Sequence, residues 1–256
     1  MEGIISTSKF IKTASAILVS IALILLPING ENGIVNQKSY AIDIISGTTD
    51  SGLTYECING IMVVIGYTGT DKDIVIPKTI EGYKVSRIAA KAFAGSELQS
   101  VDIQAEITSL SESAFECSTV QRVVLPNTLK DIGARAFYQC RSLTTINFCE
   151  GLQKIGSEAF SATQLGDITL PSTLTSIGSY SFASSFGNIT SVKFTGPTSI
   201  GSDTFQSLTS LKSVDLGDKS TLIGGSAFYC CSNLTEVKLS PNNYFGSGGI
   251  GGIFGG

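Results

Sequence analysis

The sequence predicts a β-rich solenoid in which coils of about 22–23 residues stack and each coil adds one parallel strand. A phenylalanine recurs seven times at a nearly constant interval. An aliphatic residue stands five positions before each phenylalanine, and an alternating apolar pair follows it. Because a unit this short cannot bury its own apolar face, it must stack on its neighbours. The phenylalanines are Phe93, Phe115, Phe137, Phe160, Phe182, Phe205 and Phe228.

The N-terminus, residues 1–41, has the pattern of a secretory signal peptide. Lys9 and Lys12 precede an apolar run at 14–26, and small residues precede a cleavage point after Ala41. An uncleaved anchor over residues 11–28 is the alternative, although that run is near the lower limit for spanning about 30 Å of hydrocarbon. We expect cleavage and a secreted or cell-surface protein, with membrane contact only through this segment if it is uncleaved.

A linker rich in Ser, Thr and Gly is expected at 42–53, followed by an N-terminal cap at 54–86. Two β-like runs, 53–58 and 61–67, flank Asn59-Gly60, which is the strongest short signal for a hairpin. A strand at 74–76 then leads into the repeats. Such a cap would cover apolar core that the first repeat leaves open.

Seven repeats are expected at 87–241. Alternating pairs such as Val123 and Leu125 have the period of a strand with one face inward. The Gly-x-x-Ala-Phe segment, as in 133–137, predicts a short 3₁₀ or α turn that inserts phenylalanine into the core. After Pro241 the pattern stops, and residues 242–256 are expected to be a Gly-rich disordered tail without a polar capping unit. Such a tail is typical of a linker or of a fragment of a longer chain.

The six cysteines form no C-x-x-C pair, so a zinc site has no support. In each repeat an aliphatic residue follows the phenylalanine, and the position three residues before that aliphatic residue is expected to lie inside the core. We call this position the cysteine slot. Reduced core thiols are therefore favoured. A disulfide between Cys117 and Cys140 is the alternative, because adjacent coils can bring their Cα atoms within bridging distance. The slot holds Gly95, Cys117, Cys140, Ala162, Phe186, Leu208 and Cys231.

Composition argues against catalysis and against nucleic acid as a partner. The chain has no histidine, which removes the commonest general base and zinc ligand. Its net charge of −4 disfavours polyanion binding. The recurring glycines lack the lysine of a phosphate loop. We expect no enzyme activity, no cofactor and no metal site.

The outward residues of the strand face are the natural binding surface of a solenoid. An ordinary solvated face would look the same, so these positions are candidates only. No row of aromatic residues and no basic stripe is visible among them. The candidates are Asp102, Arg122, Asn147, Thr169, Lys193, Asp215 and Lys238.

The repeats resemble the BspA-like (Treponema-type) leucine-rich-repeat surface proteins, whose pattern runs L-x-x-V-x-L-P-x-x-L-x-x-I-G-x-x-A-F-x-x-C. Residues 132–140 match its turn half, and residues 165–171 match its strand half. The resemblance covers residues 54–241 and implies a right-handed leucine-rich-repeat solenoid on an exported protein. It also implies protein binding or adhesion through the strand face.

The expected partner is a protein or another host-surface macromolecule, bound by a monomer. One alternative is a structural or presenting module of a larger envelope protein. An extracellular hydrolase is disfavoured, because the chain has no histidine and because the pattern does not bring polar side chains together at one point.

Overall fold

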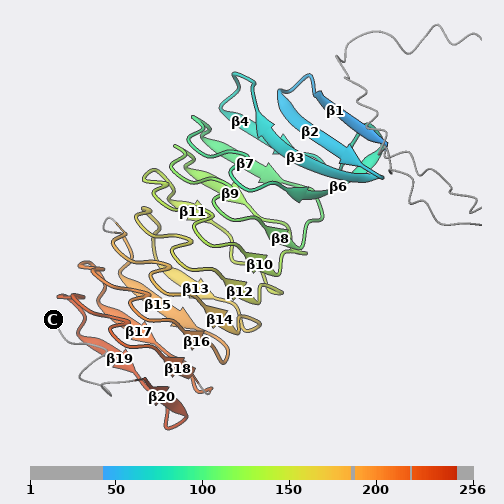
Figure 1. Ribbon diagram of the computed structural model, residues 1–256. Helices are drawn as coiled ribbons and strands as arrows, with labels where there is room; N and C mark the ends of the chain where they lie inside the picture. Colours follow the sequence, from blue (N-terminus) through green and yellow to red (C-terminus); the bar gives the residue numbers. More distant parts are fainter. Residues whose placement is uncertain (1–42, 186–187, 220, 247–256) are drawn as a thin grey trace, which may run out of the picture.

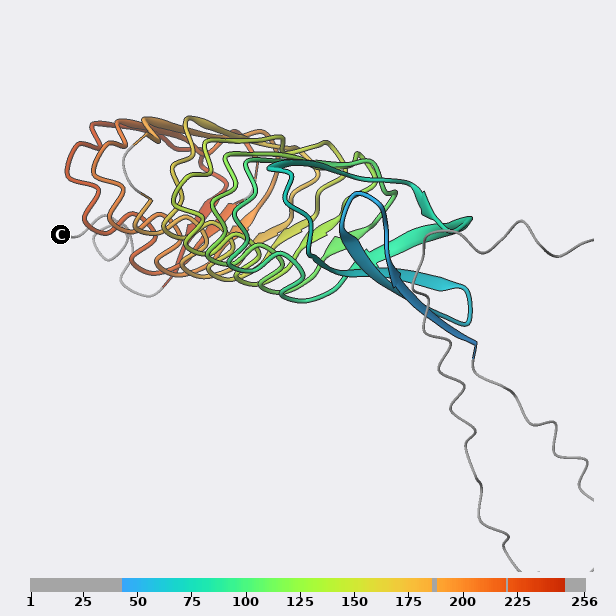
Figure 2. The same ribbon diagram turned by 90° about the horizontal axis from the view of Figure 1, so that it is seen from above.

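The computed structural model describes residues 43–185, 188–219 and 221–246. These residues form an elongated stack of coils with a β-sheet at its N-terminal end (Figure 1). Viewed from above, the coils follow one another in line, and the N-terminal sheet lies at one end of the stack (Figure 2). The predicted solenoid is confirmed. The expected signal peptide lies outside the described residues.

The N-terminal cap is a five-stranded sheet of order β1-β2-β3-β6-β5. The predicted hairpin is confirmed, since β2 (Leu53–Ile58) pairs antiparallel with β3 (Ile61–Tyr67). Asn59 and Gly60 both have positive φ, as a tight hairpin of this twist requires. The remaining strands are β1 (Ile44–Thr48), β5 (Thr79–Ile80) and β6 (Tyr83–Ile88).

The expected linker at 42–53 is more ordered than its composition indicates, because it contains β1. Strand β1 pairs antiparallel with β2 along its whole length. Ile45 packs against the core. Gly47 passes over the ring of Tyr55, where a Cβ would lie 2.7 Å from the phenolic oxygen. The small residues of this segment therefore allow close packing rather than providing a flexible connection.

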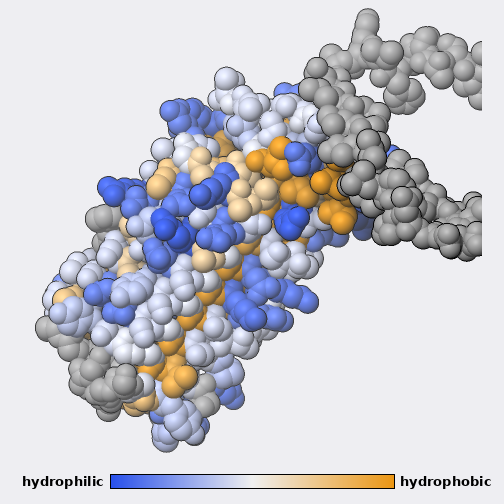
Figure 3. Space-filling view, viewed as in Figure 1, coloured by the Kyte–Doolittle hydropathy of each residue, from blue (hydrophilic) through white to orange (hydrophobic). Residues whose placement is uncertain are grey.

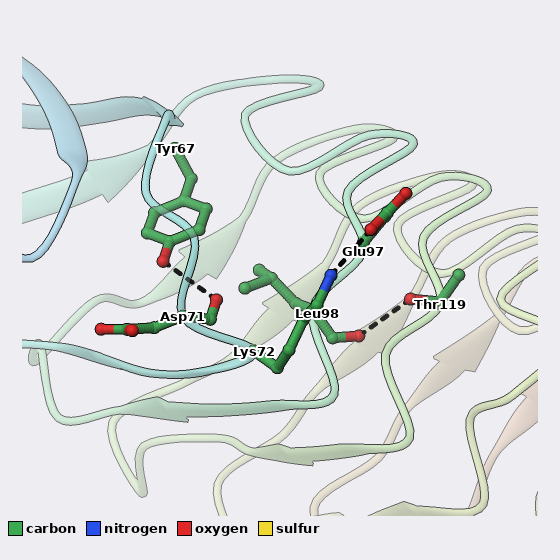
Figure 4. A network of polar contacts seen from close by, with 6 residues as sticks. All are labelled: Tyr67, Asp71, Lys72, Glu97, Leu98 and Thr119. Carbon is green, nitrogen blue, oxygen red and sulfur yellow. Dashed lines mark hydrogen bonds and ion pairs between the residues drawn. The ribbon is translucent and has the colours of Figure 1, made fainter.

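Polar contacts join the cap to the first coils (Figure 4). The hydroxyl of Tyr67, at the end of β3, donates to the carbonyl of Asp71 at 2.9 Å. Lys72 forms an ion pair with Glu97 of the next coil at 2.7 Å. The first contact fixes the loop that leads from the cap to the repeats, and the second ties that loop to the following coil.

One face of the solenoid carries the predicted parallel strands, one from each coil. They form two separate four-stranded sheets rather than one array. The first sheet contains β4 (Asp73–Ile76), β7 (Ser100–Ile103), β9 (Arg122–Val124) and β11 (Thr145–Ile146). The second contains β13 (Ile168–Leu170), β15 (Ser191–Phe194), β17 (Ser213–Asp215) and β19 (Glu236–Lys238).

The recurring aliphatic-glycine pairs form a second stack of parallel strands, so each coil contributes a further short strand beside the predicted one. The glycine N–H extends the ladder, as when Gly156 donates to the carbonyl of Ile132 at 2.8 Å. The strands are β8 (Ser109–Leu110), β10 (Asp131–Ile132), β12 (Lys154–Ile155), β14 (Ser176–Ile177), β16 (Ser199–Ile200), β18 (Thr221–Ile223) and β20 (Asn243–Phe245).

Strand β20 also corrects the expectation of a disordered tail over 242–256. Its three residues pair with β18 in the register of the other coils. Gly246 then donates to the carbonyl of Ile223, as the preceding glycines do in their own coils. The rest of the predicted tail, 247–256, lies outside the described residues.

The turns are neither 3₁₀ nor α, and none of the described residues is helical. In the coil around Phe137, the N–H groups of Ala136 and Tyr138 donate to carbonyls three residues earlier. The N–H groups of Arg135 and Phe137 instead donate to carbonyls of the next coil. Arg135 and Gln139 both have positive φ. These left-handed residues interrupt any helix and aim alternate donors at the neighbouring coil.

The phenylalanines are buried in the core, as predicted, and their rings form a continuous ladder there. Successive rings lie 4.9–5.3 Å apart between centroids and are inclined by only 4–12°. Phe148 extends from the strand side and meets Phe160 edge-on at 5.5 Å. The ladder therefore links the two sides of the core.

The cysteine slot was partly misassigned. The interior position lies three residues after each phenylalanine and holds Ser118 and Cys140, both buried. Cys117 lies one residue earlier, at a left-handed position with positive φ, and is exposed. None of the six cysteines is in a disulfide. Cys140 donates to the carbonyl of Phe115 at 2.9 Å, so it is a core thiol as expected, whereas Cys117 is not.

Thiol labelling of the folded protein should separate these two cysteines. Burial raises the pKa of the Cys140 thiol to about 12. Because the thiolate is the reactive form, Cys140 should resist alkylation at neutral and mildly alkaline pH. Cys117 should react readily, and six thiols should be counted after denaturation without reductant. Peptide mass spectrometry identifies the labelled sites. A linked Cys117–Cys140 peptide, or equal labelling rates, would contradict this assignment.

Candidate binding surface

Four of the predicted surface residues lie in one row across the second strand-face sheet. The parallel register places Thr169 beside Lys193, Lys193 beside Asp215, and Asp215 beside Lys238. Their inward neighbours, such as Val192 and Val214, are buried in the core. Successive side chains of the row are thus held at the strand spacing of about 4.8 Å.

Asp215 is the electrostatic centre of this row. Its carboxylate contacts Lys238 Nζ at 3.3 Å and accepts a hydrogen bond from the Gly217 N–H at 2.9 Å. Desolvation alone would raise the pKa of Asp215, but the hydrogen bond from Gly217 and the charges of Lys238 and Lys193 lower it overall. The row therefore presents alternating positive and negative charge at neutral pH.

The first strand-face sheet brings its candidates together less well. Arg122 pairs with Ser100 and Thr145, two residues along the strands from the row that contains Asp102. Asp102 itself lies between two valines and accepts a hydrogen bond from Gln104 at 3.0 Å. These two charged residues therefore occupy separate rows.

Asn147 has a local structural role that the pattern did not reveal. Its side-chain Oδ1 accepts the N–H of Leu125 at 2.7 Å, and its Nδ2 donates to the carbonyl of Leu125 at 3.0 Å. The amide thus occupies both backbone groups that a longer β11 would pair with. This explains why β11 has only two residues.

Asp167 is a surface residue whose role could not be inferred from the pattern. Its Oδ1 accepts hydrogen bonds from the Thr190 N–H, the Thr190 hydroxyl and the Ser191 N–H, each at 2.8 Å. Burial would raise the pKa of Asp167, but these hydrogen bonds lower it overall. In other coils a backbone carbonyl accepts the corresponding hydrogen bonds. The carbonyl of Lys212, for example, accepts hydrogen bonds from the N–H groups of Thr235 and Glu236. Asp167 therefore fixes the start of β15.

A hollow of about 430 Å³ lies where the cap meets the first coils, between β5–β6 and the loop before β8. There Lys78 is already paired with Glu106 at 3.1 Å. Across the described ranges, no three acidic or cysteine side chains gather in a way that could hold a metal ion.

The described residues include no helix long and apolar enough to cross a membrane. On the side shown in Figure 3, polar residues cover most of the coils. Hydrophobic residues gather there at the N-terminal cap and along a narrow band that follows the stack. The exposed apolar residues of the cap include Ile58, Ile61 and Ile65.

Comparison with known proteins agrees with this architecture. No curated protein matches the chain. Among solved structures, the leucine-rich-repeat protein TpLRR of T. pallidum is 29% identical with a TM-score of 0.58, over 78% of this chain and 85% of that one. The pneumococcal vaccine antigen PcpA is 20% identical with a TM-score of 0.47, over 82% of this chain and 71% of that one.

A leucine-rich cell surface protein from Faecalibacterium prausnitzii is 18% identical with a TM-score of 0.33, over 82% of this chain and 97% of that one. The sequence profile of the BspA type leucine-rich repeat region matches residues 71–187 and 176–248, in six copies. The matched segments cover well over half of the 256 residues. The chain belongs to the BspA-type leucine-rich-repeat family.

Proposed function

We propose that this protein is an exported or cell-surface binding module that attaches to another protein through the strand face of its solenoid. Its membership of a leucine-rich-repeat family supports a repeat module for protein interaction. The apolar run at 14–26 supports export. The role is adhesion or host-surface binding without catalysis, since the chain has no histidine and its outward carboxylates are spread along the stack.

The observation that carries the proposal is the charge row Lys193, Asp215 and Lys238 on one flat sheet. The parallel strands and the hydrogen bond from Gly217 hold these groups in place before a partner arrives. A surface ordered in advance loses less conformational entropy on binding. Alternating charges at fixed spacing also favour a partner with the opposite pattern and oppose one with the same pattern.

The test begins with a binding screen of the mature chain against extracellular-matrix and host cell-surface proteins. The charge of Lys193 is then reversed, and the variant is measured against the protein that binds most tightly. Lys193→Glu replaces an attraction by a repulsion, so binding should weaken about tenfold or more. The matched control is Lys154→Glu, which makes the same charge change on β12 of the second stack. Surface plasmon resonance at two salt concentrations measures both variants.

Equal binding by wild type and Lys193→Glu, with unchanged melting temperature, would move the site away from this face. Equal weakening by Lys193→Glu and Lys154→Glu would show only a response to net charge. Either result would count against the charge row as the binding site.

A further inference from the structure

The last described coil leaves part of the apolar core open to solvent. Leu239 follows β19 at the second inward position of the strand, and 43% of its surface is exposed. The residues at the same position in most earlier coils are no more than 2% exposed. They are Ile103, Leu125, Leu170, Phe194 and Leu216. An apolar side chain at a position that is buried in those coils is thus uncovered at this end.

Two further core positions are affected in the same coil. Leu234 and Val237 are only half-buried, although their equivalents Leu211 and Val214 are fully buried. Strand β19 pairs with β17 on one side and has no other strand partner within the described residues. The open core therefore adjoins a strand edge with unused backbone hydrogen-bonding groups, which is a template for pairing with another strand.

The charges on β19 indicate which strand would fit. Glu236 and Lys238 flank Val237 and both are exposed. If two copies of β19 run antiparallel about a two-fold axis at Val237, Glu236 of each copy faces Lys238 of the other. The contact between the two edges then contains two opposite-charge pairs. A two-fold axis brings the same surface of both copies together, so that surface must be complementary to itself, as this edge is. Cross-strand pairs of this kind stabilise a sheet.

The same register also covers the exposed core. Val237 would meet its own copy across the axis, and Leu239 would lie against Thr235 of the other copy, on the inward side of the joined sheet. The charge row would continue across the junction, because Lys238 would lie between Asp215 of its own chain and Glu236 of the other.

We propose that two copies of this chain associate end to end through β19, with antiparallel pairing centred on Val237. The two strand-face sheets that end in β19 then become one sheet of eight strands. The two charge rows lie on the same face of the dimer, so a partner could bind both copies at once. This proposal concerns a different contact from the binding of a partner protein.

Charged residues on an edge strand can also serve to prevent pairing. That role suits an edge of one charge sign, which repels a second copy. Here the two signs alternate, so a second copy brings the opposite charge to each position. A protected edge would also cover the core beneath it, whereas Leu239 is uncovered. The observations therefore favour association over protection.

The experiment measures the mass of the full mature chain by sedimentation velocity over a wide concentration range. We expect a reversible dimer. Glu236→Lys places like charges opposite each other twice, so it should weaken the dimer at least tenfold, and Lys238→Glu should do the same. The double variant Glu236→Lys with Lys238→Glu restores both pairs and should restore the dimer. Lys154→Glu, far from this end, is the control and should dimerise normally.

A wild-type chain that stays monomeric at every concentration would overturn the proposal. So would a dimer that both single variants leave unchanged, since the contact would then lie elsewhere. Melting temperatures of all variants show whether each one is folded. No partner protein is present in this experiment, so its failure is distinct from a failure of the binding proposal.

Discussion

Replacing Phe160 by alanine should lower the free energy of unfolding by about 3–5 kcal/mol, the usual cost of removing a buried phenylalanine. Its ring is fully buried and stacks between Phe137 and Phe182, each at 5.2 Å. It also meets Phe148 edge-on at 5.5 Å. Aromatic pairs add roughly 0.5–1.5 kcal/mol beyond burial, so we expect the upper part of this range. Thermal unfolding followed by circular dichroism should show a fall on the order of 10 °C.

Two control variants test whether the ring or only its volume matters. Phe160→Leu fills most of the space but breaks the stacking, so its loss should be about half as large or less. Tyr244→Ala removes an aromatic ring that is largely exposed and should change stability little. If Phe160→Ala melts within a degree or two of wild type, the ladder does not support the core.

The phenylalanine ladder and the cap hairpin could be predicted because each depends on a local rule. Stacking requires one large apolar residue per coil, and the regular spacing of Phe137 and Phe160 reveals it directly. A two-residue hairpin requires residues that accept positive φ, and Asn59-Gly60 is such a pair. In both cases the physical requirement falls on the residue type itself.

The cysteine slot was misassigned because the repeats vary in length. The turn has one backbone conformation from two residues before phenylalanine to three residues after it, as the positive φ of Cys117, Gln139 and Ala162 shows. The variation in length falls between this turn and the next aliphatic residue. Counting back from that residue therefore mixed positions two, three and four residues after phenylalanine, among them the exposed Cys117 and the buried Cys140.

The outward direction of the strand-face residues could be predicted, but their grouping could not. Alternation along a strand places Lys193 and Asp215 outward, and the burial of their neighbours Val192 and Val214 agrees with it. Asn147 differs from them, because its side-chain amide binds the backbone of the preceding coil and limits β11 to two residues. A polar residue at an outward position is expected in any coil, so nothing in the pattern distinguished this one.

The second strand stack was also unpredicted, although the sequence held a signal for it. Glycine follows the recurring aliphatic residue in five of seven repeats, and the pattern alone favours a tight turn at each of these glycines. Yet Gly133, Gly156 and Gly178 do not have positive φ. Glycine is needed because each Cα lies against the backbone of the preceding coil. Only the stacked structure shows that requirement.

Gly178→Ala tests that requirement and should have the second large effect on stability. An added Cβ would lie 2.4 Å from the backbone nitrogen of Ser157 and 2.8 Å from the carbonyl carbon of Gly156. Backbone atoms cannot move aside as a flexible side chain can, so the two coils must separate. That separation would strain the ladder bond in which Gly178 donates to the carbonyl of Ile155 at 2.8 Å. Overpacking of this kind costs roughly 1–3 kcal/mol, and we expect a loss near the upper limit.

The matched control is Gly166→Ala, the same substitution at a glycine whose Cβ would meet nothing within 4 Å. That variant should be neutral or slightly more stable, because alanine restricts the unfolded chain. Denaturant titration of both variants gives the two free energies of unfolding on one scale. Equal stabilities would mean that the coils have room for a methyl group. The glycine that follows the aliphatic residue in five of the seven repeats would then need another explanation.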